Sequence, residues 1–140
     1  MNDYISVENP ALWKRSLVRA LLAKSIAELI APGLEDAAYL AGLFSLIDEI
    51  LGVDKISFLR DIHLDKIIII DAYTGENERL KKILDIVSQL EERYSEMSAL
   101  EDAYNDPLLI NIEELTGIYK FDLSLMLKDA YEKANYIFNL

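Results

Sequence analysis

The sequence predicts an all-α fold in one domain of 140 residues. Apolar residues recur at three- and four-residue steps along most of the chain, which is the spacing of one face of a helix. Hydrophobic residues make up 52% of the chain, with only 5 Gly and 3 Pro, so the composition is that of a folded protein and not of a disordered one. No two segments alternate convincingly between apolar and polar residues, as paired strands do.

The first predicted helix covers residues 11–30. Asn9 is suited to cap it, Pro10 fits the first helical position, and residues 31–33 (Ala-Pro-Gly) end it. A helix with two apolar sides is expected to lie between two layers. One side contains Val18, Leu22, Ile26 and Leu29, and the other contains Trp13, Leu17, Ala20 and Ala27.

The second predicted helix covers residues 35–51 and is apolar almost all round until Asp48, which is typical of a central core helix. Gly42 in its middle costs about 1 kcal/mol of helix propensity relative to Ala, so we expect another helix to cross closely there. Gly52 is a suitable C-cap for this helix. Asp54 is a suitable N-cap for a short helix that follows.

Residues 67–70 are four isoleucines, which favour a strand because they are β-branched. A lone strand would have no partner, and unpaired buried backbone groups are costly, which argues against a strand.

The second half of the chain predicts three further helices, the first of them over residues 77–97. Asn111 or a neighbour is expected to cap a short helix through Leu115, and Asp122 to cap the last helix, over residues 123–138. The apolar stripe of the helix over 77–97 contains Leu80, Ile83, Leu84, Val87, Leu90, Tyr94 and Met97.

The charge balance disfavours two classes of partner. Fourteen basic residues face 25 acidic ones, for a net charge of −11, so nucleic-acid phosphates and anionic membrane surfaces would both be repelled. The densest basic group is Lys14, Arg15 and Arg19, and we expect it to be the solvated edge of a helix.

Several kinds of site and segment are disfavoured because the chain lacks the residues that they need. It has no cysteine, which excludes disulfides and thiolate metal sites. The N-terminus does not read as a signal peptide and no apolar run is long enough to span a bilayer, so we expect a cytoplasmic protein. Gly-rich phosphate-binding loops are absent as well.

His63 is the only histidine, and together with Asp65 it superficially looks like a metal-binding pair. A single histidine cannot supply the several ligands of such a site, and the others would all have to be carboxylates. We therefore interpret His63 as a loop residue between two short helices. With one histidine and no cysteine, the chain offers almost no residues for imidazole- or thiolate-centred nucleophilic catalysis.

Two other groups of residues have both a functional and a structural interpretation. A group of carboxylates in the second half of the chain could act in acid–base catalysis or bind Mg²⁺ or Ca²⁺. Their spacing fits no calcium-binding loop, so we expect them to form a solvated acidic face. These carboxylates are Glu91, Glu92, Glu96, Glu101, Asp102 and Asp106. Tyr119, Tyr131 and Tyr136 could anchor a partner, although such residues more often cover the edge of a core.

Residues 42–48 carry the clearest resemblance to a known family. They read Gly-Leu-Phe-Ser-Leu-Ile-Asp, and they resemble the segment that holds the central His-Asp pair of HD-type metal phosphohydrolases. Ser45 and Leu46 stand where that His and Asp would be. The string is similar to one found in HDOD output domains of bacterial signalling proteins, especially those fused to EAL domains. Residues 17–20 and 131–135 extend the resemblance, and the chain looks like the C-terminal two-thirds of an HDOD domain.

The resemblance implies an orthogonal multi-helix bundle of HD/HDOD type, with a helix over residues 67–70. It also implies a degenerate, metal-free domain with no catalytic residues and no cofactor, used for protein–protein interaction in bacterial signal transduction. Two alternatives stay open. One is an HD-type metal phosphohydrolase with non-standard ligands, and the other is a purely structural oligomerisation domain.

A possible interface follows from the same resemblance. The helices that precede this region in the family are absent, so one apolar side of the first helix should lack a cover. The side through Trp13 and Leu17 lies nearest to the missing segment. Large exposed apolar patches normally mark interfaces, so we expect a homodimer or a protein partner at this side.

Overall fold

The computed structural model describes residues 9–63, 67–94 and 105–138. No strand occurs in these ranges, so the predicted all-α class is confirmed for them. In chain order the helices are α1 (Pro10–Ile30), α2 (Glu35–Leu43), α3 (Ile47–Leu51), α4 (Lys55–Asp61), α5 (Ile67–Thr74), α6 (Glu78–Arg93), α7 (Pro107–Thr116) and α8 (Lys120–Phe138).

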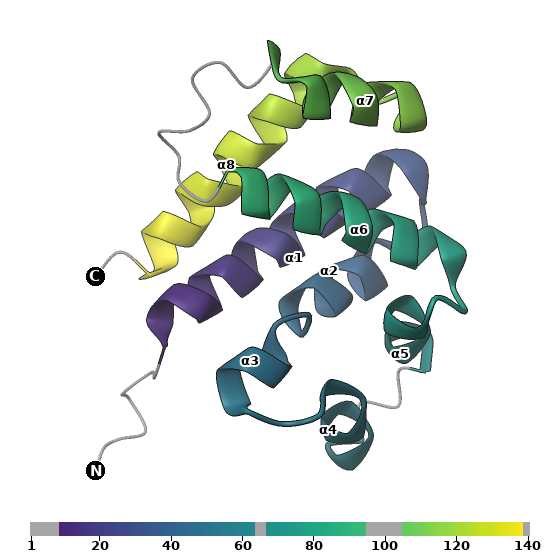
Figure 1. The fold of residues 1–140 in the computed structure, drawn as a ribbon, viewed down its shortest axis with the longest axis vertical. Helices are drawn as coiled ribbons and strands as arrows, with labels where there is room; N and C mark the ends of the chain where they lie inside the picture. The colour runs from purple at the N-terminus through teal and green to yellow at the C-terminus, as the bar shows by residue number, and fades with distance from the viewer. Residues whose placement is uncertain (1–8, 64–66, 95–104, 139–140) are drawn as a thin grey trace.

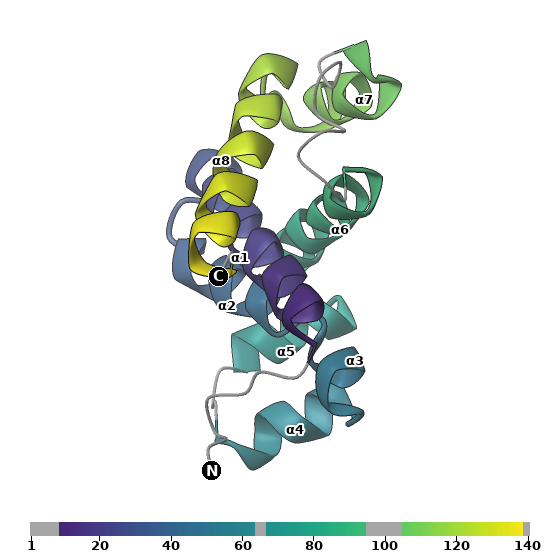
Figure 2. The same cartoon turned by 90° about the vertical axis from the view of Figure 1, so that its left-hand side faces the viewer.

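Helix α1 is the central element of the bundle. It packs against α2, α6 and α8. Figure 1 shows α2 and α8 on either side of it, and the perpendicular view shows α6 on the opposite face from α2 and α8 (Figure 2). Val18, Leu22 and Ile26 are fully buried, as predicted for a helix between layers, whereas Leu29 in the last turn is exposed. The central position therefore belongs to α1 and not, as predicted, to the helix that begins at Glu35.

The single helix predicted over residues 35–51 is wrong, because the structure divides it into α2 and α3 at a turn over residues 44–46. Ser45 Oγ donates to the Gly42 carbonyl at 2.7 Å, and the Lys55 ammonium donates to the Ser45 carbonyl at 3.1 Å. In a continuous helix these two carbonyls would accept hydrogen bonds from backbone N–H groups. At the turn, the Ser45 and Lys55 side chains donate to them instead, so both carbonyls remain hydrogen-bonded.

Gly42 lies at a close crossing of α1 and α2, as the sequence predicts. A Cβ added there would lie 2.8 Å from the Arg19 carbonyl oxygen and 2.9 Å from Ala20 Cα. Both atoms belong to the α1 backbone, so no side chain can move aside to make room. Glycine is therefore required because α2 approaches the backbone of α1 directly.

Several helix ends follow the predicted local chemistry. Asp54 accepts a hydrogen bond from Ser57 N at the start of α4, and Gly52 closes α3 in the left-handed region at φ 67°. Asn77, predicted as the first residue of its helix, instead caps α6 through Leu80 N. Residues 67–70 are helical, within α5, which confirms the choice of helix over strand.

One predicted cap holds in position only, and two are wrong. Asn9 occupies the N-cap position of α1, directly before Pro10, but it adopts φ 55° and makes no side-chain capping bond. Helix α7 covers the ten residues Pro107–Thr116 and is capped by Asp106, so Asn111 lies inside the helix. Asp122 lies in the first turn of α8 and not before it. In α7 the Asp106-Pro107 pair is the stronger start signal, because Pro suits the first position and Asp the one before it.

Among the residues that the structure describes, no helix combines the length and the apolar character needed to cross a membrane.

Candidate functional site

The turn at residues 44–46 carries the positions where the HD-type resemblance expects metal ligands. The Ser45 hydroxyl is engaged with the Gly42 carbonyl, and the Leu46 side chain is buried at 3% exposure. The Lys55 ammonium lies beside this turn, over the ring of Tyr73 at 4.4 Å from its centroid. A fixed positive charge there would repel a divalent cation. In the described ranges, no three His, Asp or Glu side chains lie together in a way that could hold a metal ion.

His63 is exposed and lies between α4 and α5, as predicted for a loop histidine. Its φ is 53°, in the left-handed region. Asp65 lies outside the described residues, so the structure does not test the pairing of His63 with Asp65.

The predicted solvated acidic face is wrong for Glu91, whose exposure is only 1%. Arg15 donates to both of its carboxylate oxygens, from Nε at 2.8 Å and Nη2 at 3.0 Å. Arg19 Nε donates to Glu91 Oε1 at 3.0 Å. The predicted solvated edge through Arg15 and Arg19 is therefore also wrong, since Arg19 is 7% exposed and both side chains join α1 to α6.

This buried ion cluster is structural. A carboxylate without a partner would be very unfavourable at this depth, and paired arginines remove most of that cost. Arg19 Nη1 also donates to Ser88 Oγ at 3.3 Å, so the second arginine is held by two groups of α6. Glu91 follows Val87 by four residues on the apolar stripe, and a charge on such a stripe is the sequence signal that could have revealed its burial.

Asp106 is likewise not part of a solvated face. It accepts hydrogen bonds from Arg93 Nε at 2.7 Å, Tyr94 Oη at 2.6 Å and Leu108 N at 2.9 Å. Burial by itself would raise the pKa of Asp106, but the bonds from Tyr94, Leu108 and Arg93 outweigh it and lower that pKa below its usual value. Asp106 thereby ties the end of α6 to the start of α7.

The other late carboxylates divide between the surface and the undescribed part of the chain. Glu92 is exposed on α6, as predicted. Glu96, Glu101 and Asp102 lie outside the described residues.

The three late tyrosines have different environments. Tyr131 is buried at 5% exposure, and its hydroxyl donates to the Tyr94 carbonyl, so it belongs to the edge of the core. Tyr119 is 57% exposed and its ring lies against Phe121, with 6.4 Å between centroids. Tyr136 is 88% exposed near the end of α8. Only Tyr119 and Tyr136 are therefore available to a partner.

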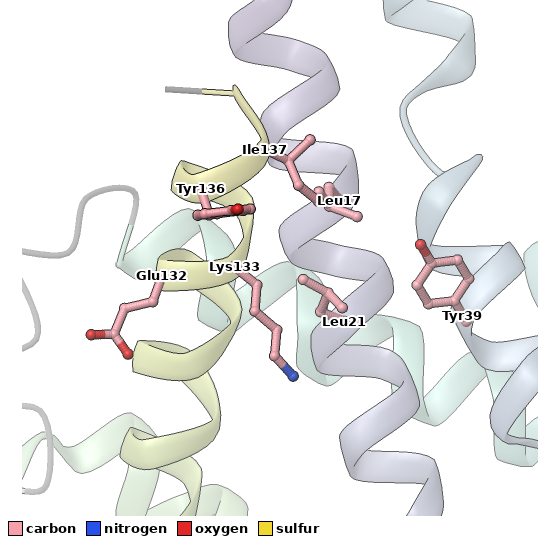
Figure 3. A pocket seen from close by; sticks show the side chains of 7 residues that line it. All are labelled: Leu17, Leu21, Tyr39, Glu132, Lys133, Tyr136 and Ile137. Atoms are coloured by element: carbon pink, nitrogen blue, oxygen red, sulfur yellow. The ribbon is translucent and has the colours of Figure 1, made fainter. Parts of the chain in front are cut away.

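An apolar groove of about 370 Å³ runs over α1 between α2 and α8, and we call it the α1/α2/α8 groove. Leu17 and Leu21 form its floor, Tyr39 of α2 stands on one side, and residues of α8 form the other (Figure 3). Lys133 and Ile137 reach toward the two leucines, while the carboxylate of Glu132 points away from α1 (Figure 3). The α8 lining consists of Glu132, Lys133, Tyr136 and Ile137.

The groove corrects the prediction that the side of α1 through Trp13 and Leu17 lacks a cover. Leu17 is only 9% exposed, and Ala20 and Ala27 are fully buried, because α2 and α8 pack over this side. Trp13 is half-buried and does not line the groove. The open apolar surface lies one turn further along, at Leu21, which belongs to neither of the two predicted apolar sides.

A second hollow, of about 250 Å³, lies where the ends of α1 and α7 meet α6. Two basic side chains from α6 line it, but both serve helix ends. Arg79 donates to the Ile30 carbonyl at 3.2 Å and Lys82 to the Leu115 carbonyl at 3.4 Å. Cations at helix C-termini are stabilising, so this hollow is explained by helix capping.

Comparison of the chain with protein-family models, with curated proteins and with solved structures found no match.

Proposed function

We propose that this chain is a non-catalytic helical interaction module of bacterial signal transduction, with a bundle of HD/HDOD type. The observation that carries the proposal is the α1/α2/α8 groove, with Tyr136 and Ile137 exposed at 88% and 53% on its edge. An apolar hollow edged by exposed aromatic and aliphatic side chains is typical of a binding surface.

The environment of the former ligand positions supports the absence of metal chemistry in this proposal. Leu46 is buried in the core, the Ser45 hydroxyl is occupied by the backbone, and an ammonium stands beside the turn. A metal hydrolase would need several ligands that converge on an open position, together with room for a water. Lys55 instead joins the start of α4 to the turn that follows α2.

The proposal is tested by comparing the wild-type chain with a Tyr136→Ser/Ile137→Ser double variant. Both proteins are used as bait in the source cell, and partners are quantified by mass spectrometry. We expect a defined partner that the wild type retains and the double variant loses. Stoichiometric Fe, Mn or Zn in the purified protein, or metal-stimulated hydrolysis of cyclic dinucleotides, would refute the proposal in favour of an HD-type enzyme.

A second candidate function, self-assembly, is favoured by a separate patch at the other end of α8. Phe121 and Leu125 are one turn apart and are 50% and 47% exposed, and Tyr119 lies against Phe121. A structural oligomerisation domain would bury this patch between copies. Light scattering of the wild type and of Phe121→Ser tests it, since only an assembly through this patch would dissociate in the variant.

A further inference from the structure

We propose that the chain's own N-terminal segment, residues 1–8, folds back along α1 into the α1/α2/α8 groove. Ile5 and Val7 would lie over the floor of the groove, and the carboxylates of Asp3 and Glu8 would lie next to lysines. The inference goes beyond the proposed function, because it concerns a contact within one chain, and it does not depend on that function.

The groove lies close to the point where the segment joins the bundle. The described chain starts at Asn9, whose φ of 55° and ψ of 54° are left-handed, so the backbone bends directly before α1 and does not extend the helix. Leu17, on the floor of the groove, is eight residues further along, or about 12 Å along the helix axis. The last turn of α8 lies beside this part of α1, since its Ile137 reaches toward Leu17 (Figure 3). A segment that folds back at Asn9 therefore meets the groove.

The length of the segment fits the length of the floor. Ile5 precedes Asn9 by four residues, which an extended chain covers in about 13 Å, and this distance brings it level with Leu17. Asp3 precedes Asn9 by six residues and reaches about 20 Å in the same conformation. Leu21, at the far end of the floor, is about 18 Å from Asn9 along the axis of α1. The segment is thus long enough to cover the whole floor.

The apolar residues of the segment suit the surface that the groove leaves open. Leu21 is half-buried and Ile137 is 53% exposed. Residues 4–7 read Tyr-Ile-Ser-Val, and in an extended chain Ile5 and Val7 point to the same side because side chains alternate. Two aliphatic side chains would then cover the open part of the floor and the edge formed by α8, while the serine between them faces away.

The charges beside the groove are complementary to those of the segment. Lys133 reaches toward the two leucines of the floor, whereas the carboxylate of Glu132 points away from α1 (Figure 3). Lys14 lies one turn before the floor on α1. Residues 1–8 include Asp3 and Glu8 but no Lys or Arg. A second copy of the chain is disfavoured as the occupant, because both copies carry a net charge of −11 and repel each other.

The existing ion pair of Lys133 is compatible with this contact. Its Nζ lies 3.0 Å from Asp129 Oδ2, and the two side chains are 60% and 58% exposed. Exposed pairs of this kind are weak. An ammonium also has three donors, so Lys133 can bind a second carboxylate while it keeps the first.

The test measures disulfide formation within the full chain, which has no cysteine of its own. One variant combines Ile5→Cys with Tyr136→Cys, at the edge of the groove. The control combines Ile5→Cys with Glu92→Cys. Glu92 is exposed on α6 and follows Glu91, the partner of Arg15, so it lies beside the same part of α1 but on the opposite face from α8 (Figure 2).

A docked segment should react mainly at the groove. We expect the disulfide to Tyr136→Cys to form at least about tenfold faster than the disulfide to Glu92→Cys under mild oxidation, because docking raises the effective concentration of the thiol there. A segment with no preferred position would form both at similar rates. Circular dichroism of the reduced variants confirms that each is folded.

Three further substitutions, each added to both pairs, show what holds the segment. Val7→Ser should lower the ratio of the groove rate to the control rate several-fold, because it removes an apolar contact. Asp3→Lys should also lower this ratio, because it replaces an attraction to Lys133 with a repulsion. Ser6→Ala is the matched control and should leave the ratio unchanged.

Similar rates for the two pairs, or a ratio that Val7→Ser and Asp3→Lys leave unchanged, would overturn the inference. A groove disulfide that joins two chains, seen as a dimer on a non-reducing gel, would overturn it as well and would identify a second copy as the occupant. The proposed function is tested separately by the capture of a cellular partner. Its failure would leave the ratio of the two disulfide rates unchanged.

Discussion

Helix α1 uses its two long sides in opposite ways. On the side that faces α6, Arg15 and Arg19 close over Glu91, whose exposure is 1%. On the side between α2 and α8, Leu17 and Leu21 form the floor of an open apolar groove. The charged pair of Arg19 and Glu91 is thus buried on one side, whereas Leu21 stays partly exposed on the other.

This contrast separates stability from binding. A buried, paired carboxylate is costly to disturb because its arginines would be left without a partner. Exposed apolar residues contribute little to folding, because they stay in contact with water in the folded state. Substitutions on the α6 side should therefore unfold the protein, whereas substitutions at the edge of the groove should alter only what it binds.

The largest effect is expected from Glu91→Gln. The substitution keeps the shape of the side chain but leaves Arg19 buried without a counter-charge, and we expect a loss of about 3–5 kcal/mol in the free energy of unfolding. Urea denaturation measures it. Asp85→Asn makes the same chemical change in the exposed Lys81–Asp85 pair, where the side chains are 51% and 57% exposed. There we expect less than about 1 kcal/mol. Equal losses of unfolding free energy in Glu91→Gln and Asp85→Asn would show that the Glu91 ion pairs contribute no more to stability than an exposed pair.

A smaller loss of stability is expected from Gly42→Ala. This substitution should affect the groove as well as stability, because Gly42 and the groove residue Tyr39 are both in α2. Helix propensity favours Ala by about 1 kcal/mol, but the new Cβ would meet the α1 backbone, and overpacking of this kind costs about 1–3 kcal/mol. We expect a net loss of stability, greater still for Gly42→Leu, together with weaker binding in the groove. An increase in melting temperature for either variant would contradict the close crossing.

Asp106→Ala tests a polar anchor that is not part of either side of α1. Loss of the α7 cap and of the bonds from Arg93 and Tyr94 should cost about 1–2 kcal/mol at neutral pH. The folded-state pKa of Asp106 is lowered, so its contribution is complete above the unfolded-state pKa of about 3.9 and disappears as the pH falls through the folded-state value. The stability difference between the wild type and the variant should therefore shrink in acid. A difference that is constant from pH 7 down to strongly acidic pH would rule out a role for the ionised carboxylate.

The smallest change in stability is expected from Tyr136→Ser, at the edge of the groove. Because Tyr136 is 88% exposed, we expect the free energy of unfolding to change by less than about 0.5 kcal/mol. Thermal and urea unfolding measure it. A loss as large as that of Asp106→Ala would mean that Tyr136 is part of the folded core, and the separation of binding from stability along α1 would no longer hold.

Much of the secondary structure could be predicted because its signals are local. A capping carboxylate bonds to a backbone N–H only three residues away, as in Asp54 with Ser57. The close crossing at Gly42 was also visible, because glycine inside a predicted helix is otherwise unfavourable. The break at residues 44–46 was missed, and one of the bonds that stabilise it comes from Lys55, which reaches back from a different helix.

The sequence by itself determined an all-helical chain, several of its helix ends and the need for glycine where α2 meets α1. The tertiary structure alone decided which charges are buried and which apolar residues stay open. Arg15 and Arg19 lie 76 and 72 positions from Glu91, and no local pattern can show that they will neutralise it. Likewise, Leu17 and Leu21 became the floor of a groove only because α2 and α8 stand on either side of them. Hydrogen bonds within a helix follow from neighbouring residues, whereas the solvation of a side chain depends on whatever the fold packs against it.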